Sequence, residues 1–134
     1  MAKLNVPITA VITGEGCSGG ALGLAVADKV FMLEHAYYTV ISPEGCASIL
    51  WRDASKADVA AKALKITSED LLKLEIIDGI IKEPLGGAHC DYETVAANLK
   101  TTVMNAINEL KHKDPALLRE ERYNKFRRMG VFCQ

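Results

Sequence analysis

VPITAVITGEGCSGGALGLAVA, residues 6–27, is the stretch that decides the fold of this chain. An apolar, β-branched run at 8–12 enters a glycine-dense turn, and a segment rich in alanine and leucine at 21–27 leaves it. The pattern predicts a buried strand, a tight loop and a buried helix, because continuous apolar runs are typical of strands covered on both faces. Glycine at this density is tolerated where the backbone turns sharply or approaches a ligand closely.

The glycine turn offers a place to hold a negatively charged oxygen. Gly19 and Gly20 are expected on the first turn of the helix, where backbone N–H groups have no acceptor within the helix. Together with the positive end of the helix dipole, these groups can hold an oxyanion or a phosphate. Ser18 is expected to cap the helix with its hydroxyl. A glycine-rich turn that only packs the helix against the strand is the equally weighted alternative.

Composition and charge exclude several classes of protein. The 134 residues are 49% hydrophobic and 25% charged, which is typical of one soluble globular domain. A net charge of −1 gives no reason to expect nucleic acid or acidic lipid as a partner. No apolar run reaches the roughly 18 residues that span a membrane, and no signal-peptide stretch is visible, so an intracellular protein is expected.

The cysteines and histidines predict neither disulfides nor a metal site. The four cysteines are widely spaced and form no C-x-x-C pair, so four reduced thiols are expected in an intracellular chain. The three histidines show no ligand spacing either, and we expect no bound metal.

Turn and capping signals divide the next part of the chain into short elements. Strands are expected at 29–33 and at 37–41, the second because it is rich in aromatic and β-branched residues. Ser42-Pro43-Glu44 then opens a helix, with serine as N-cap and proline at the first helical position. Capping boxes at 55–58 and 67–70 predict two further helices.

The last part of the chain is expected to be mainly helical. A β-like isoleucine run at 76–81 precedes it, and from Asp91 apolar residues repeat at the spacing of one long amphipathic helix. Asp114-Pro115 starts a final helix that Gly130 ends. Its basic side chains are expected to form a solvated face: Arg119, Arg122, Lys125, Arg127 and Arg128. With only about four short strands, the chain is inferred to be the C-terminal part of a larger α/β domain, or half of a site completed by another chain.

A dinucleotide-binding domain is a remote alternative. Gly14, Gly16 and Gly19 match G-x-G-x-x-G, and Glu34 follows at the distance of the ribose-binding acid. Against this, the predicted helix is short, Glu15 would place a carboxylate beside the pyrophosphate, and alternating β and α units are lacking.

Side chains suited to catalysis have simpler interpretations. Glu44 fits a first-turn partner of a helix dipole, with a carboxylate facing a pocket as the alternative. Cys17 fits a small loop residue, with a thiol of lowered pKa as the alternative. His89 fits a loop hydrogen bonder better than a catalyst. No serine has a histidine or aspartate at a telling spacing.

Three long and unusual strings carry a resemblance to a known family. They are VPITAVITGEGCSGGALGLAVADKVFML, YTVISPEGCASILWRDASKADVAAKAL and IIDGIIKEPLGGAH. The chain resembles the carboxyltransferase α subunit of bacterial and plastid acetyl-coenzyme A carboxylase, from residue 6 to 89 and more loosely to 132. Family members are much longer on the N-terminal side, so the resemblance implies a C-terminal portion.

The resemblance implies a fold and a reaction. The fold would be α/β, a crotonase-like spiral of β-β-α units, with residues 1–90 as the C-terminal part of the carboxyltransferase domain and 91–134 as its helical extension. The reaction would be transfer of a carboxyl group from carboxybiotin, held on a carrier protein, to acetyl-coenzyme A, giving malonyl-coenzyme A for fatty-acid synthesis. The location would be the bacterial cytoplasm or the plastid stroma.

The resemblance also implies site residues and partners. In the family, paired backbone amides of an S-G-G segment hold the biotin carbonyl oxygen, which places these donors on Gly19 and Gly20. Ser18, in the same segment, and Glu44, if its carboxylate faces a pocket, are the candidates for substrate binding. The partners would be a carboxyltransferase β subunit in an α2β2 assembly, the biotin carboxyl carrier protein and acetyl-coenzyme A. The alternatives are a subunit of another biotin-dependent acyl-coenzyme A carboxyltransferase or decarboxylase, and an inactive fragment that only binds a partner.

Overall fold

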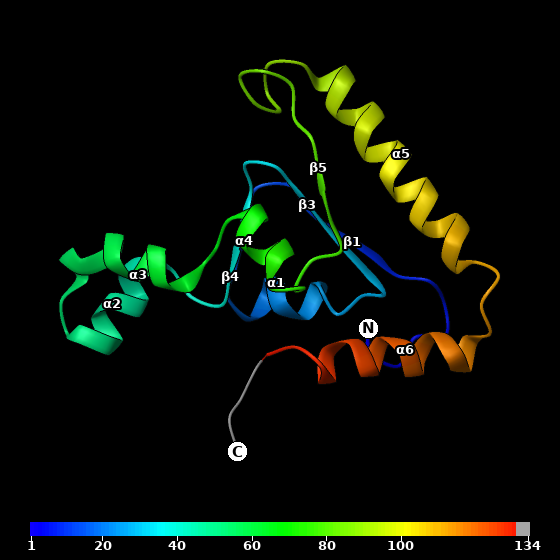
Figure 1. Ribbon diagram of the computed structural model, residues 1–134, viewed down its shortest axis with the longest axis horizontal. Helices are drawn as coiled ribbons and strands as arrows, with labels where there is room; N and C mark the ends of the chain where they lie inside the picture. The colour runs from blue at the N-terminus through cyan, green and yellow to red at the C-terminus, as the bar shows by residue number, and fades with distance from the viewer. Residues whose placement is uncertain (131–134) are drawn as a thin grey trace.

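The computed structural model describes residues 1–130 (Figure 1). The strands in that range are β1 (Thr9–Ile12), β2 (Glu15–Cys17), β3 (Lys29–Leu33), β4 (Tyr37–Thr39) and β5 (Gly79–Ile81). The helices are α1 (Ser18–Leu24), α2 (Pro43–Trp51), the 3-10 turn η1 (Ala54–Lys56), α3 (Ala57–Leu64), α4 (Ser68–Lys73), α5 (Tyr92–Leu110) and α6 (Pro115–Arg127).

The strands form two small parallel sheets. The larger has the order β1-β3-β5, with Thr9 opposite Lys29 and Phe31 opposite Gly79. The smaller pairs β2 with β4. Chain order therefore gives two β-β-α units, β1-β2-α1 and β3-β4-α2, in which corresponding strands lie side by side. This repeat is the one expected of a β-β-α spiral.

The core lies between the larger sheet and the helices that cover it. Met32 and Ala27 are completely buried, and the core cluster includes residues of all three strands of that sheet. The apolar face of α5 packs against this cluster through Val95 and Leu99, and α5 runs beside β5 in Figure 1. The predicted amphipathic helix after Asp91 is thus confirmed, with Asp91 as its N-cap.

Two of the four expected serine or threonine caps are present. Ser42 Oγ accepts a hydrogen bond from the Gly45 amide at 3.1 Å, and Thr67 Oγ1 accepts one from the Asp70 amide at 3.3 Å. The capping box at 55–58 is wrong: Asp53 caps the 3-10 turn instead, and α3 continues from it. The cap at Ser18 is also wrong, because Cys17 holds the N-cap position and Ser18 is the first helical residue.

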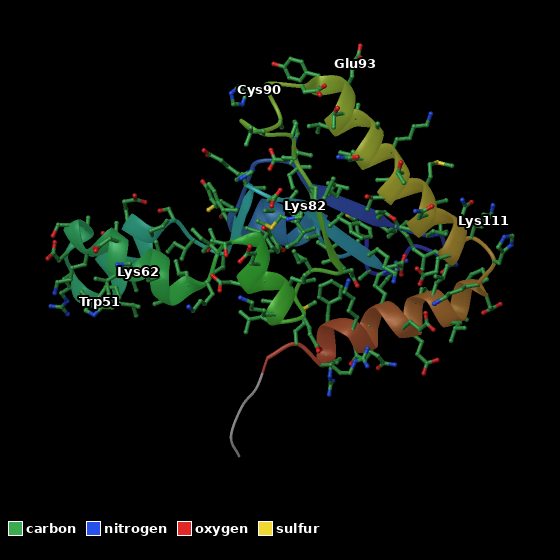
Figure 2. The ribbon with its side chains drawn as sticks, turned by 45° about the horizontal axis from the view of Figure 1, so that its top comes forward. Trp51, Lys62, Lys82, Cys90, Glu93 and Lys111 are labelled. Atoms are coloured by element: carbon green, nitrogen blue, oxygen red, sulfur yellow. The ribbon has the colours of Figure 1, made fainter. Side chains whose placement is uncertain are left out.

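Helices α2 and α3 form an arm, residues 43–64, to one side of the strands (Figure 1). Its two helices contact each other, and each has one completely buried alanine, Ala47 in α2 and Ala60 in α3. Trp51 and Lys62 lie on this arm, away from the sheets (Figure 2). Ile49 and Leu50 leave most of their surface exposed, so the arm presents apolar side chains to its surroundings.

The expected solvated face of α6 is wrong for two of its five basic residues. Arg122 is only 2% exposed, and its guanidinium binds Asp28, which directly precedes β3. Lys125 binds Asp78, which directly precedes β5. The spacing of charges along a helix does not reveal that two aspartates at strand starts face it, which is why the sequence pattern was misleading here.

Three cysteines are described, and Cys17, Cys46 and Cys90 are free thiols. Cys133 lies outside the described residues. Among the helices of residues 1–130, none combines the length and the apolar character that a membrane crossing requires.

Candidate oxyanion site

Two helices begin at neighbouring strand ends. α1 follows β2 directly, and α2 follows β4 after three residues. Because β2 and β4 are parallel partners, both helices start at the carboxyl edge of the same small sheet. Ligands of parallel α/β sheets bind at this edge. The topology thus brings the predicted residues Ser18, Gly19 and Gly20, at the start of α1, to the same sheet edge as Glu44, in the first turn of α2.

The backbone at the start of α1 has an unusual conformation. Ser18 has a φ of 67°, in the left-handed region that a residue with a side chain rarely adopts, and Gly19 and Gly20 continue as right-handed helix. A left-handed residue beside right-handed ones turns successive N–H groups toward one side, which makes an anion-binding concavity. Such strain persists where the surrounding structure enforces it, and it is concentrated at functional sites.

The glycines of the turn serve two different purposes. A Cβ atom on Gly16 would lie 3.0 Å from Ile12 Cγ2 and 3.1 Å from Tyr38 Cδ2, so a side chain there would force these neighbours to shift. A Cβ atom on Gly19 or Gly20 would meet no heavy atom within 4 Å. Both residues are exposed, and nothing inside the described chain requires glycine at these positions. Their bare backbone therefore leaves room for another molecule.

A groove of about 390 Å³ runs beside this turn. It lies along the outer edges of β1 and β2, which pair only with β3 and β4 among the described strands. Its lining is mainly apolar and comes from β1, the glycine turn and α1: Ala10, Val11, Ile12, Thr13, Gly14, Glu15, Gly16, Cys17, Ala21, Leu24 and Ala25. The turn that carries Gly19 and Gly20 is therefore bordered by an open strand edge.

Acidic side chains lie near Tyr37, the first residue of β4. Tyr37 is the register partner of Glu15. Burial raises the pKa of the Tyr37 hydroxyl above its ordinary value, and a hydrogen bond with the Glu15 carboxylate and nearby charges, among them that of Glu44, add to the shift. Glu44 is exposed in the first turn of α2, as expected for a dipole partner. Sequence reasoning missed Tyr37 because no chemical motif marks it.

The acid of the dinucleotide pattern has other partners. Glu34 Oε1 binds Lys82 Nζ, and Glu34 Oε2 accepts a hydrogen bond from the Glu83 amide at 3.4 Å. The hydrogen bond from Lys82, which follows β5, lowers the pKa of Glu34, so this carboxylate at the end of β3 is held ionised. Gly16, the second glycine of the pattern, packs against Tyr38. This arrangement differs from a dinucleotide site, where the acid binds ribose and the glycine faces pyrophosphate.

The loop of the string EPLGGAH is built on a buried carboxylate. Glu83 has a side chain only 5% exposed and accepts hydrogen bonds from the His35 amide, from His35 Nδ1 and from the Ala88 amide. His89 is exposed in the same loop, and Gly87 before it has a φ of 97°. Among residues 1–130, no group of three or more His, Cys, Asp or Glu side chains is arranged to hold a metal ion.

Comparison with known proteins identifies the family. The model of the family described as acetyl co-enzyme A carboxylase carboxyltransferase-like matches residues 1–130. Similar curated proteins are the acetyl-coenzyme A carboxylase carboxyl transferase α subunits of Protochlamydia amoebophila and Geobacter metallireducens, each 57% identical over all 134 residues. The chain covers 42% of each of these relatives, so it spans less than half of their length.

Solved structures show the fold. A transcarboxylase 12S structure superposes with a TM-score of 0.66 at 18% identity, over 84% of this chain and 22% of that one. A Pseudomonas malonate decarboxylase hetero-tetramer in complex with coenzyme A gives 0.64 at 13% identity, over 90% of this chain and 48% of that one. Both have the crotonase-like fold, and the expected fold class is confirmed. The chain belongs to the acetyl-coenzyme A carboxylase carboxyltransferase family.

Proposed function

We propose that this chain is part of a carboxyltransferase α subunit that moves a carboxyl group from carboxybiotin to acetyl-coenzyme A. The product is malonyl-coenzyme A for fatty-acid synthesis, made in the bacterial cytoplasm or the plastid stroma. The family and the names of the relatives support this reaction. The observation that carries the site assignment is the left-handed turn at Ser18, which opens into the exposed backbone of Gly19 and Gly20.

The proposed role of the turn follows from the charge that it has to stabilise. When bound, carboxybiotin would supply the carboxyl group, and cleavage of its N–C bond would place negative charge on the ureido oxygen. The amides of Gly19 and Gly20 would donate to that oxygen as neutral dipoles, which need no titration. Removing one such donor typically costs about 3 kcal/mol of transition-state stabilisation. The proposed stabilisation of the negatively charged oxygen therefore depends on backbone amides alone and needs no titrating side chain of this chain.

The residues present fit a ligand of this kind. The side-chain-free surface of Gly19 and Gly20 admits a carbonyl oxygen to contact distance, which a Cβ atom on either would restrict. We assign Ser18 to binding through its own amide, which precedes the two glycine amides in the same turn. Glu44, at the same sheet edge, is assigned to a polar group of the bound substrate.

The proposed site is shared with a second chain. The thioester enolate needs its own set of N–H donors, and Gly86-Gly87 is the remaining glycine pair in this chain. That pair has φ angles of 93° and 97° in a turn, and no helix starts there. We therefore assign the second set to a carboxyltransferase β subunit, in an α2β2 assembly served by a biotin carboxyl carrier protein.

The test is an assay of the full-length protein together with its β subunit and carboxybiotin. Malonyl-coenzyme A formed from acetyl-coenzyme A, at a higher kcat/KM than the product from propionyl-coenzyme A, supports the proposal. A clear preference for propionyl-coenzyme A assigns the chain to another acyl-coenzyme A carboxyltransferase. Co-purification of the two subunits without turnover assigns it a partner-binding role.

A further inference from the structure

The helix that carries the proposed donors Gly19 and Gly20 is weakly packed. None of the seven residues of α1 is buried. An apolar cavity of about 360 Å³ lies beside the helix, and on the α1 side it is lined by Leu22, Ala25 and Val26. Because a cavity replaces close-packed side chains there, the position of α1 depends strongly on how its two ends are held.

The two ends of α1 are held in different ways. At the amino end, β2 leads directly into Ser18, and the backbone of β2 pairs with β4. After the carboxyl end, the chain passes through Ala27, which is completely buried, to Asp28. The Asp28 amide donates to the Ile8 carbonyl at 2.9 Å, and the Asp28 carboxylate accepts a hydrogen bond from the Ile8 amide at 2.7 Å. Asp28 thus joins the end of the α1 segment to the residue that precedes β1.

Helix α6 binds the same aspartate through two side chains. Arg122 Nε and Nη2 each donate to a carboxylate oxygen of Asp28 at 2.8 Å. Lys125 Nζ donates to the Asp28 carbonyl oxygen at 3.2 Å and also binds the Asp78 carboxylate. Residues three apart on a helix share one face, so one face of α6 holds both the side chain and the backbone of Asp28. The side chains of Arg122 and Asp28 are 1% and 5% exposed, so water competes little for their hydrogen bonds.

The end of α6 also reaches the cavity beside α1. Phe126, in the last turn of α6, and Met129, just after the helix, line this cavity together with the three α1-side residues. Figure 1 shows α6 next to α1. One helix therefore holds the residue at which the α1 segment ends and forms a wall of the cavity that α1 borders.

We propose that Arg122 and Lys125 are positioning residues for carboxyl transfer. By holding Asp28, they fix the carboxyl end of α1, and with it the direction in which the amides of Gly19 and Gly20 point. The proposal rests on the function proposed above, in which these amides stabilise a negatively charged oxygen. Such donors act at about 2.7–3.1 Å from the oxygen, and a misplacement of about 1 Å can lower a rate on the order of a hundredfold.

The test uses the full-length protein in complex with its β subunit, with rates expressed per assembled complex. Arg122→Lys keeps a charge beside Asp28 but has three donors in place of five, and Lys125→Met removes the bond to the Asp28 carbonyl. Each should lower kcat on the order of tenfold or more. The KM for acetyl-coenzyme A should stay at the wild-type value, because the thioester is assigned to the other set of donors. Amide exchange of residues 21–27 should accelerate, because the end of α1 is held less firmly.

Two controls separate positioning from a general loss of stability. Arg119→Lys makes the arginine-to-lysine change at an exposed position of α6, one turn earlier. Glu83→Gln weakens hydrogen bonds to a buried carboxylate at the opposite end of the larger sheet, so it costs stability without touching Asp28. Both variants should retain the wild-type kcat per assembled complex, and Arg119→Lys should also retain wild-type exchange of residues 21–27.

The two readouts together decide the proposal. A lower kcat at unchanged KM, with faster exchange of residues 21–27, supports it. Wild-type exchange of these residues in both variants overturns it, and so does faster exchange at the wild-type kcat. Lys125→Met leaves the buried pair of Arg122 and Asp28 in place, so it decides the test alone if Arg122→Lys does not assemble. Absence of turnover in the wild-type complex would contradict the proposed function, and the exchange rates would then decide separately whether α6 positions α1.

Discussion

The Glu83 carboxylate accepts hydrogen bonds from both the backbone amide and the ring Nδ1 of His35, at 2.6 and 2.9 Å, although 48 residues separate the two in sequence. The other carboxylate oxygen accepts one from the Ala88 amide at 2.9 Å. One buried side chain thus joins the turn after β3 to the loop after β5.

This pair predicts a pH-dependent loss of stability. Burial opposes ionisation of Glu83, but the hydrogen bonds from the His35 and Ala88 amides and from the His35 ring outweigh it and lower the Glu83 pKa below 4.5. A lowered folded-state pKa means that the stabilisation is complete above 4.5 and is lost as the pH falls through the folded-state value. Glu83→Gln should cost about 2 kcal/mol at pH 7, because hydrogen bonds to a charged group are lost. Denaturant unfolding should show this difference shrinking below pH 4.5, and a constant difference down to pH 3 would contradict the assignment.

A second prediction separates packing glycines from site glycines. Gly16→Ala places a Cβ atom 3.0 Å from Ile12 and 3.1 Å from Tyr38, which should cost about 1–3 kcal/mol of stability through overpacking. Gly14→Ala is the matched control, because a Cβ atom there meets nothing within 4 Å. Thermal unfolding of the two variants provides the measurement. Equal midpoints would show that the close contact at Gly16 does not constrain the turn.

The third prediction concerns the cysteines. All four are expected to be reduced, because their spacing suits neither a disulfide framework nor a metal site. Alkylation under denaturing, non-reducing conditions, followed by intact-mass measurement, should show four adducts. Two adducts would reveal a disulfide.

The fourth prediction is that these 134 residues alone lack carboxyltransferase activity and self-associate. They carry one proposed set of oxyanion donors, at Gly19 and Gly20. The edges of β1 and β2 along the 390 Å³ groove have no strand partner among residues 1–130, and such apolar edges favour pairing with another chain. Sizing chromatography should show an oligomer. A stable monomer with measurable turnover would contradict both the shared site and the open edge.

The elements with strong local signals could be predicted from the sequence. β3 has the expected bounds, the helices opened by Ser42 and Thr67 have the expected caps, and the amphipathic helix expected after Asp91 is present. In these places, residue spacing and capping chemistry act within a few residues. β2 was not predicted, because its three residues include Gly16 and are ordered by pairing with β4.

The parts that depend on distant residues could not be predicted. Arg122 is separated from Asp28 by 94 positions, so helical spacing alone indicated a solvated side chain. Asp53, rather than Ser55, caps the turn before α3, because two capping residues close together compete. For the candidate site, glycine spacing indicated where the turn is, but the left-handed conformation of Ser18 and the open space at Gly19 and Gly20 required the structure.

Carboxyl transfer by Gly20→Val, compared with Gly23→Val, tests the central claim most directly. Both glycines lie in α1 and a Cβ atom on either meets nothing within 4 Å, so the two substitutions should cost the fold similarly. Of these two glycines, Gly20 contributes an amide to the proposed donor pair and Gly23 does not. The donor pair acts through contact at about 2.7–3.1 Å. In the full-length protein bound to its β subunit, Gly20→Val should lose carboxyl transfer, and Gly23→Val should retain it, with both complexes still assembling. Wild-type kcat in an assembled Gly20→Val complex would contradict the assignment of Gly20 to the site.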